Sequence, residues 1–482
     1  MSSSREEIRS RWVLGSAAAF AMAWAITRAA VQSITIDEAG TYNQFVSRRL
    51  FLWYGSNNHV LNSTLMYGFT KFFGVSQFTA RLPALLGAAL YIWASYRLCR
   101  LLTTSLLVRL TLFVCLVFNP FIFDHLVAAR GYGLALAFLM WAMVYFAEHR
   151  MEERFLLVAC AVSSVCAGLS VDANFSFAFV SLATVAAIFL CAQRQQPHDW
   201  VNLLAACTLP AAAVIAIVSG ATLLDYHSGQ LIYGAQSLGE TFGSIIEASL
   251  FQTRFDFLGP AVFPLVGVTG LVWLLYLLVS RAKAKIALFG WAAAAIFVVT
   301  VAIHWTAFRL FGLLLPKDRT AIYFFPLLMI AAGVLASIPP PSRLAGYLRG
   351  SFIASLAIMA VYFLLCLRLT YFKEWFWDAD VQKTYAVLSC LNREHQITHV
   401  ASVWSYRGPL NFYQHAQPIS MPEIDEKLDS DQVQVYVVDT LHTPEVSEGR
   451  DLKIFYRGPT TDLVLAANPQ LAEAFASGTC LR

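Results

Sequence analysis

Long apolar segments follow one another along most of the first 370 residues, and they restrict the possible folds more than any other feature. Each is roughly 17 to 23 residues long, which is the length that a helix needs to cross the hydrocarbon core of a membrane. About eleven spans are predicted, at residues 12–31, 82–102, 105–123, 131–147, 154–171, 174–192, 200–222, 260–280, 286–306, 321–338 and 349–369.

The composition agrees with a membrane protein. Of the 482 residues, 58% are hydrophobic and 13% are charged, whereas soluble domains contain about 25% charged residues. The net charge of +4 gives no reason to expect nucleic-acid binding. We therefore predict a mostly α-helical, polytopic membrane protein.

The positions of Arg and Lys predict the orientation, because cytoplasmic loops are enriched in these residues. With the N-terminus in the cytoplasm, every predicted inside loop carries at least one cation, including Arg5, Arg97, Arg150, Arg194, Lys283 and Arg343. An odd number of spans then places the C-terminal segment outside. The predicted location is the plasma (inner) membrane, with an extracytoplasmic C-terminal domain.

The segment 371–482 is mixed and polar, and we predict it as a second domain after a transmembrane catalytic domain at 1–370. Strand-like runs at 399–403, 433–438 and 452–456 follow a helix-period stretch at 381–394. Alternating helix and strand signals of this kind predict a small α/β domain.

The cysteines divide between the two predicted domains. Seven of the nine lie in or beside apolar spans, where Cys behaves as a small hydrophobe. The other two, Cys390 and Cys480, lie in the tail. Because the predicted compartment of the tail is oxidising, we predict that Cys390 and Cys480 form a disulfide.

Two adjacent carboxylates, Asp37 and Glu38, follow the first apolar span at the start of a long outer loop, 32–81, which also contains His59. The aromatic, amphipathic stretches of this loop are typical of helices that lie in the membrane interface. Charges are costly beside lipid. The pair therefore either caps a short helix or acts on a substrate at the membrane surface.

Two further outer loops carry charged and aromatic residues. One contains Asp124, Arg130 and Tyr132, and the other contains Lys317 and Arg319. The structural alternative is that these cations extend to the membrane surface as ordinary helix-end residues. A third loop holds Tyr226, Tyr233 and Arg254, which either line an acceptor path or, as we favour, form an interfacial belt.

Cations and carboxylates that gather on one face of a membrane suit one kind of reaction. Arg and Lys hold a phosphate, while a carboxylate takes the proton from an incoming hydroxyl nucleophile. A sugar linked to a lipid phosphate would use both groups and would explain the membrane setting. Asp37, His59 and Asp124 also offer metal ligands, but without a recognisable ligand spacing, so a divalent metal stays possible.

Short motifs in these loops resemble those of the integral-membrane glycosyltransferases of the GT-C class, in particular the protein O-mannosyltransferases and the lipid A aminoarabinose transferases. The resemblance covers about the first 340 residues. It rests on Asp37-Glu38-Ala39 with His59, Arg81-Leu82-Pro83, Asn119-Pro120 with Arg130 and Tyr132, and Pro316, Arg319 and Pro326. In the tail, Trp375, Asp378 and the run Gly408–Tyr413 also resemble these enzymes.

The resemblance implies an inverting transfer from a polyprenyl-phosphate sugar to an acceptor hydroxyl on a lipid, glycan or protein. It implies Asp37 as the catalytic base or its neighbour, and Arg130 and Arg319 as contacts of the phosphate. We also predict Glu38 as catalytic and His59, Asp124, Tyr132 and Lys317 as substrate-binding. The chain departs from the pattern at Ala128, where many relatives carry Glu, and its nearest acid is Asp124.

Two other functions fit a polytopic chain with charged residues. A transporter or flippase of lipid-linked sugars typically has charges near the bilayer centre and repeated halves, whereas these charges lie in outer loops and no repeat is visible. A polysaccharide polymerase or ligase would still transfer a glycosyl group, but from a lipid-linked glycan.

Overall fold

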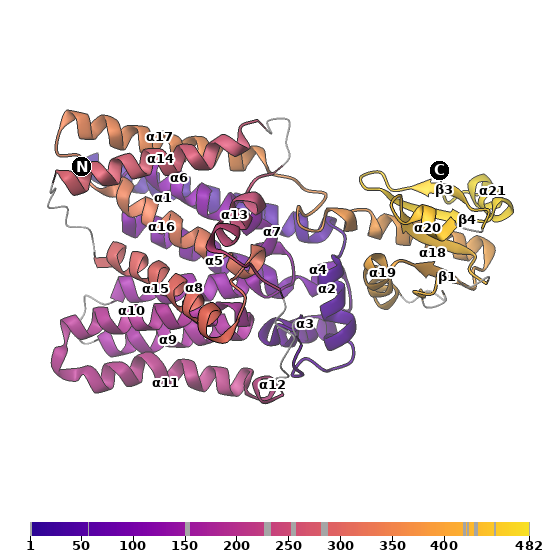
Figure 1. Cartoon of the computed structure of the whole chain (residues 1–482), viewed down its shortest axis with the longest axis horizontal. Helices are drawn as coiled ribbons and strands as arrows, with labels where there is room; N and C mark the ends of the chain where they lie inside the picture. The colour runs from indigo at the N-terminus through magenta and orange to yellow at the C-terminus, as the bar shows by residue number, and fades with distance from the viewer. Residues whose placement is uncertain are drawn as a thin grey trace.

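A computed structural model describes residues 2–55, 57–149, 155–225, 233–251, 257–280, 288–417, 421, 424–428, 432–447 and 450–481. Long helices lie side by side in a bundle, and a small mixed domain packs at one end of it (Figure 1). This architecture confirms the predicted fold class, a polytopic helical protein with a small α/β domain.

The helices of the bundle coincide with the predicted apolar spans. Among the described helices, nine are long and apolar enough to cross a membrane. They are α1 (Ser2–Val31), α5 (Leu82–Leu102), α8 (Tyr132–His149), α9 (Leu156–Ala173), α10 (Ala178–Gln195), α11 (Trp200–Val218), α14 (Gly259–Val279), α15 (Leu288–Phe311) and α17 (Arg343–Leu365).

Two predicted spans differ from straight crossing helices. The segment 105–123 falls on α6 (Leu106–Phe118) and α7 (Pro120–Val127), which meet at 57° and give a tenth span if they are counted together. The bend occurs because Asn119 ends α6 and its side chain accepts a hydrogen bond from Ile122 N (3.1 Å), while Pro120 starts α7. The segment 321–338 contains α16 (Phe324–Ser337), which has only 14 residues.

Short helices fill the outer loops. The first loop forms α2 (Ile36–Thr41), the π-helix η1 (Tyr42–Val46), α3 (Val60–Phe73) and α4 (Gln77–Ala80). Later loops form η3 (Phe175–Phe177), η4 (Pro197–Asp199), α12 (Gly220–Leu224), α13 (Leu238–Ser249) and η5 (Asp318–Ala321). A capping box starts α2: Thr35 Oγ1 accepts from Glu38 N (3.2 Å), and Glu38 Oε2 accepts from Thr35 N (2.9 Å).

The C-terminal domain contains a four-stranded sheet with the order β1-β2-β4-β3. β1 is parallel to β2, and the other two neighbouring pairs are antiparallel. Its elements are η6 (Phe376–Asp378), α18 (Val381–His395), β1 (Val400–Ser402), α19 (Trp404–Ala416), β2 (Val435–Asp439), α20 (Thr443–Ser447), β3 (Lys453–Arg457), β4 (Leu463–Ala467) and α21 (Pro469–Ser477).

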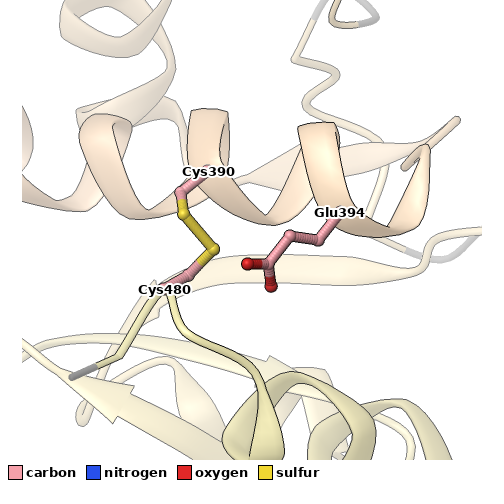
Figure 2. Close-up of side chains that lie close together, drawn as sticks. All are labelled: Cys390, Glu394 and Cys480. Carbon is pink, nitrogen blue, oxygen red and sulfur yellow. A yellow bond between two sulfur atoms is a disulfide. The ribbon is translucent and has the colours of Figure 1, made fainter.

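A disulfide joins Cys390 in α18 to Cys480, which follows α21, with the sulfurs 2.08 Å apart (Figure 2). This is the pair that the sequence predicts. The bond ties α18 to the segment after α21, although the two cysteines are 90 positions apart in the sequence.

The C-terminal domain packs directly on the first outer loop. Tyr413 in α19 donates to Gln77 Oε1 (2.6 Å) and accepts from Ile34 N (2.9 Å). The rings of Tyr42 and Phe412 meet edge to face at 5.1 Å. Residues of both parts thereby form one buried apolar cluster, and this interface places the domain beside Asp37.

Candidate active site

Asp37 lies in the first turn of α2 and lines a cavity of about 1090 Å³. Its Oδ2 lies 3.0 Å from Arg319 Nη1 and 3.8 Å from Arg130 Nε, and it accepts from Trp375 Nε1 at 3.1 Å. Burial favours a higher pKa for Asp37, but Arg130, Arg319 and Trp375 outweigh it, so the pKa lies below its ordinary value. Asp37 is therefore ionised at neutral pH.

Glu38 faces the opposite way and is completely buried. Arg81 donates to both of its carboxylate oxygens, Nε to Oε1 at 2.8 Å and Nη2 to Oε2 at 2.7 Å. Ala129 N also donates to Oε1, at 2.7 Å. Burial favours a higher pKa for Glu38, but Arg81 and the backbone donors lower it overall. Glu38 thus joins α2, α5 and the segment before α8.

The two predicted arginines approach Asp37 from different elements. Arg130, which precedes α8, is buried, and its Nη1 donates to Thr41 Oγ1 (3.1 Å) and Asp37 O (3.3 Å). Arg319 in η5 also pairs with Glu374 Oε1 at 2.5 Å. The three predicted residues Asp37, Arg130 and Arg319 therefore form one charged cluster, which Glu374 extends.

Glu374 and Trp375 are functional candidates that the sequence analysis did not select as site residues. They lie in the linker after α17, and both touch the Asp37 cluster. Burial favours a higher pKa for Glu374, but nearby His125 and Arg319 outweigh it and lower the pKa. Trp375 belongs to a tail motif that resembles the GT-C enzymes, and that motif was the available signal.

His59 and Tyr132 lie together beside the cluster. Both are buried, their ring centroids are 5.5 Å apart, and both line a second cavity of about 360 Å³. His59 Nε2 has no hydrogen-bond partner among the described residues. Burial and then Arg130 and Arg319 hold the pKa of His59 well below its ordinary value. A neutral imidazole is therefore available to a ligand in this cavity.

Asp124 in α7 forms hydrogen bonds to α1 and to the linker after α17. Its Oδ1 accepts from Arg28 Nη2 in α1 at 2.7 Å. Its Oδ2 accepts from Arg368 Nη2 and from Lys373 N, each at 2.7 Å. Both carboxylate oxygens are thus occupied by the first span and the linker, although the side chain also borders a third cavity of about 310 Å³.

Lys317 does not join the cluster. Its Nζ pairs with Glu240 Oε1 in α13 at 2.7 Å, and none of its described contacts is with Asp37, Arg130 or Arg319. Tyr233 lies under Arg319, with the guanidinium carbon 5.9 Å from the ring centroid, and borders the second and third cavities. Tyr226 and Arg254 lie outside the described residues.

The candidate metal ligands do not meet in one place. Among the described residues, Cys390, Glu394 and Cys480 are the one group of three donors close enough to share an ion. Figure 2 shows that the two sulfurs are bonded to each other, with the Glu394 carboxylate beside them. Disulfide sulfurs are not thiolate ligands, so this group does not form a metal site in its oxidised form.

No family model matches the chain, and no curated protein is similar to it. The solved structures that align over nearly its whole length include ArnT and AftD. ArnT from Cupriavidus metallidurans in the apo state has a TM-score of 0.50 at 12% identity, with 96% of this chain and 99% of that chain covered. Arabinofuranosyltransferase AftD from Mycobacteria has a TM-score of 0.51 at 15% identity, with 95% of this chain and 40% of that chain covered.

At these identities the likeness establishes a common fold. That fold is the one of the GT-C class of membrane glycosyltransferases, which confirms the resemblance noted in the sequence. The alignment with ArnT is nearly complete for both chains, whereas the chain spans less than half the length of AftD.

Proposed function

We propose that this protein is a membrane glycosyltransferase that moves a sugar from a polyprenyl-phosphate donor to an acceptor hydroxyl, with Asp37 as the base. The observation that carries the proposal is the position of the Asp37 carboxylate. It lines a cavity of about 1090 Å³, and two arginines from separate outer loops, Arg130 and Arg319, flank it. A carboxylate and paired cations within one cluster meet the needs of proton removal and phosphate binding.

The second cavity supports a lipid-linked donor. Much of its wall is apolar, from residues such as Phe175, Phe179 and Leu313, while His59 and Tyr132 add polar atoms. An apolar wall suits a polyprenyl chain, and the nearby guanidinium of Arg319, which lies over Tyr233 of the same wall, suits its phosphate. Donor and acceptor would then approach the cluster from different cavities.

The reaction balances without a further reactant. The acceptor oxygen forms a bond to the anomeric carbon of the sugar while the bond from that carbon to the phosphate oxygen breaks. The departing electron pair stays on the phosphate, which Arg130 and Arg319 stabilise, and the hydroxyl proton passes to Asp37. Attack from the face opposite the phosphate inverts the anomeric carbon.

A low pKa is compatible with this role of Asp37. The hydroxyl becomes strongly acidic only as its oxygen bonds to the anomeric carbon, so the base must be ionised and in reach rather than strong. Arg130 and Arg319 keep the Asp37 carboxylate ionised. Glu38 and Asp124, whose oxygens are taken by arginines, would position these elements instead of touching substrate.

The proposed reaction takes place on the outer face of the plasma (inner) membrane. This assignment rests on the distribution of Arg and Lys among the loops, which favours a cytoplasmic N-terminus. The C-terminal domain, which packs beside Asp37, would then also be extracytoplasmic. Its disulfide agrees with an oxidising compartment.

Asp37→Asn is the direct test, because an amide keeps the shape of the side chain but cannot take the proton. We expect the purified variant to release polyprenyl phosphate from its lipid-linked sugar about 10²- to 10⁴-fold more slowly than the unmodified protein. Asp451→Asn, at an exposed site in the C-terminal domain, is the matched control and should keep full activity.

Two outcomes would refute the proposal. One is an Asp37→Asn protein that inserts into membranes normally and still transfers at the full rate. The other is movement of the intact lipid-linked sugar between leaflets without release of polyprenyl phosphate, because that is the result expected of a flippase.

A further inference from the structure

The cavity that Asp37 lines is built jointly by the first outer loop and the C-terminal domain. One wall comes from α2 and η1, and the other comes from α19 and the segment after it. Its volume of about 1090 Å³ reaches the upper end of the range, roughly 300–1,000 Å³, that is typical of small-molecule sites. The cavity is therefore large enough for more than one sugar ring.

Residues with amide side chains line both walls of this cavity, among them Asn43 and Asn411. Asn43 Nδ2 donates to Gly408 O across the two walls at 2.9 Å, while its Oδ1 is buried and has no partner among the described residues. Asn411 Oδ1 on the opposite wall is also buried and also has no partner among the described residues. A buried acceptor without a donor is costly, so a rotation of either side chain that turned its oxygen towards the cavity would let it accept a hydroxyl hydrogen from a ligand.

An exposed aromatic ring stands on the same wall. Trp404, the first residue of α19, is 67% exposed although it lines the cavity. An aromatic face packs well on the C–H face of a sugar ring, and the indole N–H can still donate a hydrogen bond. Amide oxygens together with a flat aromatic surface match a polyhydroxylated ring.

The charges of the cavity wall are balanced. Its lining contains two arginines, Arg48 and Arg407, and two acids, Asp37 and Glu426, and Arg407 pairs with Glu426 at 2.7 Å. Among the described residues of this wall, no cluster of several cations faces the space. An anionic headgroup or an acidic sugar would need such cations, so the wall favours a ligand without net charge.

The wall also lacks the feature that most often binds an extended peptide. None of its described residues belongs to a β-strand, so it offers no strand edge for a peptide to extend. We propose that this cavity binds an uncharged glycan and presents one of its hydroxyl groups to Asp37. The inference rests on the proposed function and names its acceptor class.

Trp404→Ala and Asn411→Ala test this inference. In the transfer assay, the acceptor is the neutral fraction of delipidated envelope glycans, separated from the acidic fraction by anion exchange. We expect each variant to raise the apparent KM for the neutral fraction about tenfold, the loss that corresponds to one aromatic or hydrogen-bonding contact. The KM for the lipid-linked donor should change by less than about twofold, since the donor is assigned to another cavity.

The matched controls are Trp200→Ala and Asn202→Ala, in α11, which does not line the cavity. They should keep both KM values. A second readout is independent of turnover: addition of the neutral fraction should slow amide hydrogen exchange in α19 of the unmodified protein, and Trp404→Ala should abolish this protection.

The results separate this inference from the proposed function. Transfer only to the acidic fraction, to a lipid extract or to protein would overturn the glycan assignment while leaving the glycosyltransferase in place. An unchanged acceptor KM in both Trp404→Ala and Asn411→Ala would also overturn the glycan assignment and leave the glycosyltransferase in place. If the unmodified protein released no polyprenyl phosphate with any of these acceptors, the proposed function would fail and this inference with it.

Discussion

Asp37 and Glu38 are neighbours, yet their carboxylates lie in opposite environments. Successive residues of an α-helix project about 100° apart, so the first turn of α2 sends Asp37 to the large cavity and Glu38 into the protein interior. Each carboxylate then receives arginine donors from other elements. The difference between the two residues lies in access to the cavity, since burial and arginines lower both pKa values overall.

Glu38→Gln should strongly destabilise the protein. The variant leaves Arg81 charged and completely buried without its anionic partner, and breaking a buried pair in this way costs roughly 3–5 kcal/mol. We expect a clearly lower midpoint of thermal unfolding in detergent. Glu473→Gln is the matched control, because its pair with Lys453 is largely exposed and contributes little. Equal midpoints for the two variants would contradict this role of Glu38.

Sequence reasoning could identify some of these residues but not their partners. Asp37, Arg130 and Arg319 could be predicted because each stands out as a charge beside an apolar span. The hydrogen bonds that Arg28 and Arg368 donate to Asp124 could not be predicted, because the bonded residues lie up to 244 positions apart in the sequence. Glu374 was missed because a lone acid in a linker carries no local signal that it will meet Arg319.

At the scale of elements, glycines set the distance between α5 and α8. A Cβ atom at Gly87 would lie 2.6 Å from Leu134 N and 2.7 Å from the carbonyl carbon of Gly133. Both of these atoms belong to the backbone and cannot rotate away. Small residues of this kind allow membrane helices to pack closely. Here the close contact holds the start of α8, which follows Arg130 and contains Tyr132.

Gly87→Ala should therefore separate α5 from α8. Overpacking of this kind typically costs about 1–3 kcal/mol, so we expect a lower unfolding midpoint, together with slower transfer because Arg130 shifts with α8. Gly267→Ala in α14 is the matched control, since a Cβ atom there would meet nothing within 4 Å. A Gly87→Ala protein as stable and active as this control would show that the helices can adjust.

The elements differ in how well sequence predicts them. Membrane spans are recognised from apolar length, a property of a single segment, and every predicted span contains a helix. The strand β4 was not predicted, because its five residues are all buried and show no alternation of polar and apolar side chains. Such a run cannot be told from a piece of buried helix by its periodicity.

At the scale of the whole molecule, a buried acid joins the two domains. Asp378 in η6 is buried, and its Oδ2 accepts from Ile36 N at the start of α2, at 2.7 Å. Its Oδ1 has no hydrogen-bond partner among the described residues. Burial, together with the nearby carboxylates of Asp37 and Glu38, holds the pKa of Asp378 well above its ordinary value, although the Ile36 N–H opposes the shift.

This raised pKa predicts how pH acts on the joint between the domains. The folded protein holds the Asp378 proton more tightly than the unfolded chain does. The contribution of Asp378 to stability is therefore complete below the unfolded pKa, and it is lost as pH rises towards the folded pKa. Within that window the loss is about 1.4 kcal/mol per pH unit. Above it, the domain interface contains a buried charge beside Asp37 and Glu38.

Asp378→Asn should remove this dependence, because its amide oxygen can still accept from Ile36 N and never ionises. We expect the variant to unfold at about the same temperature as the unmodified protein in acid, and at a higher temperature as the pH rises. Asp451→Asn, at an exposed site, is the control, because it shows how much the loss of one carboxylate charge alone changes the unfolding temperature. Parallel curves of unfolding midpoint against pH for the variant and the unmodified protein would show that Asp378 has the same pKa in the folded and unfolded states. The proton on Asp378 would then not stabilise the contact between the C-terminal domain and the start of α2.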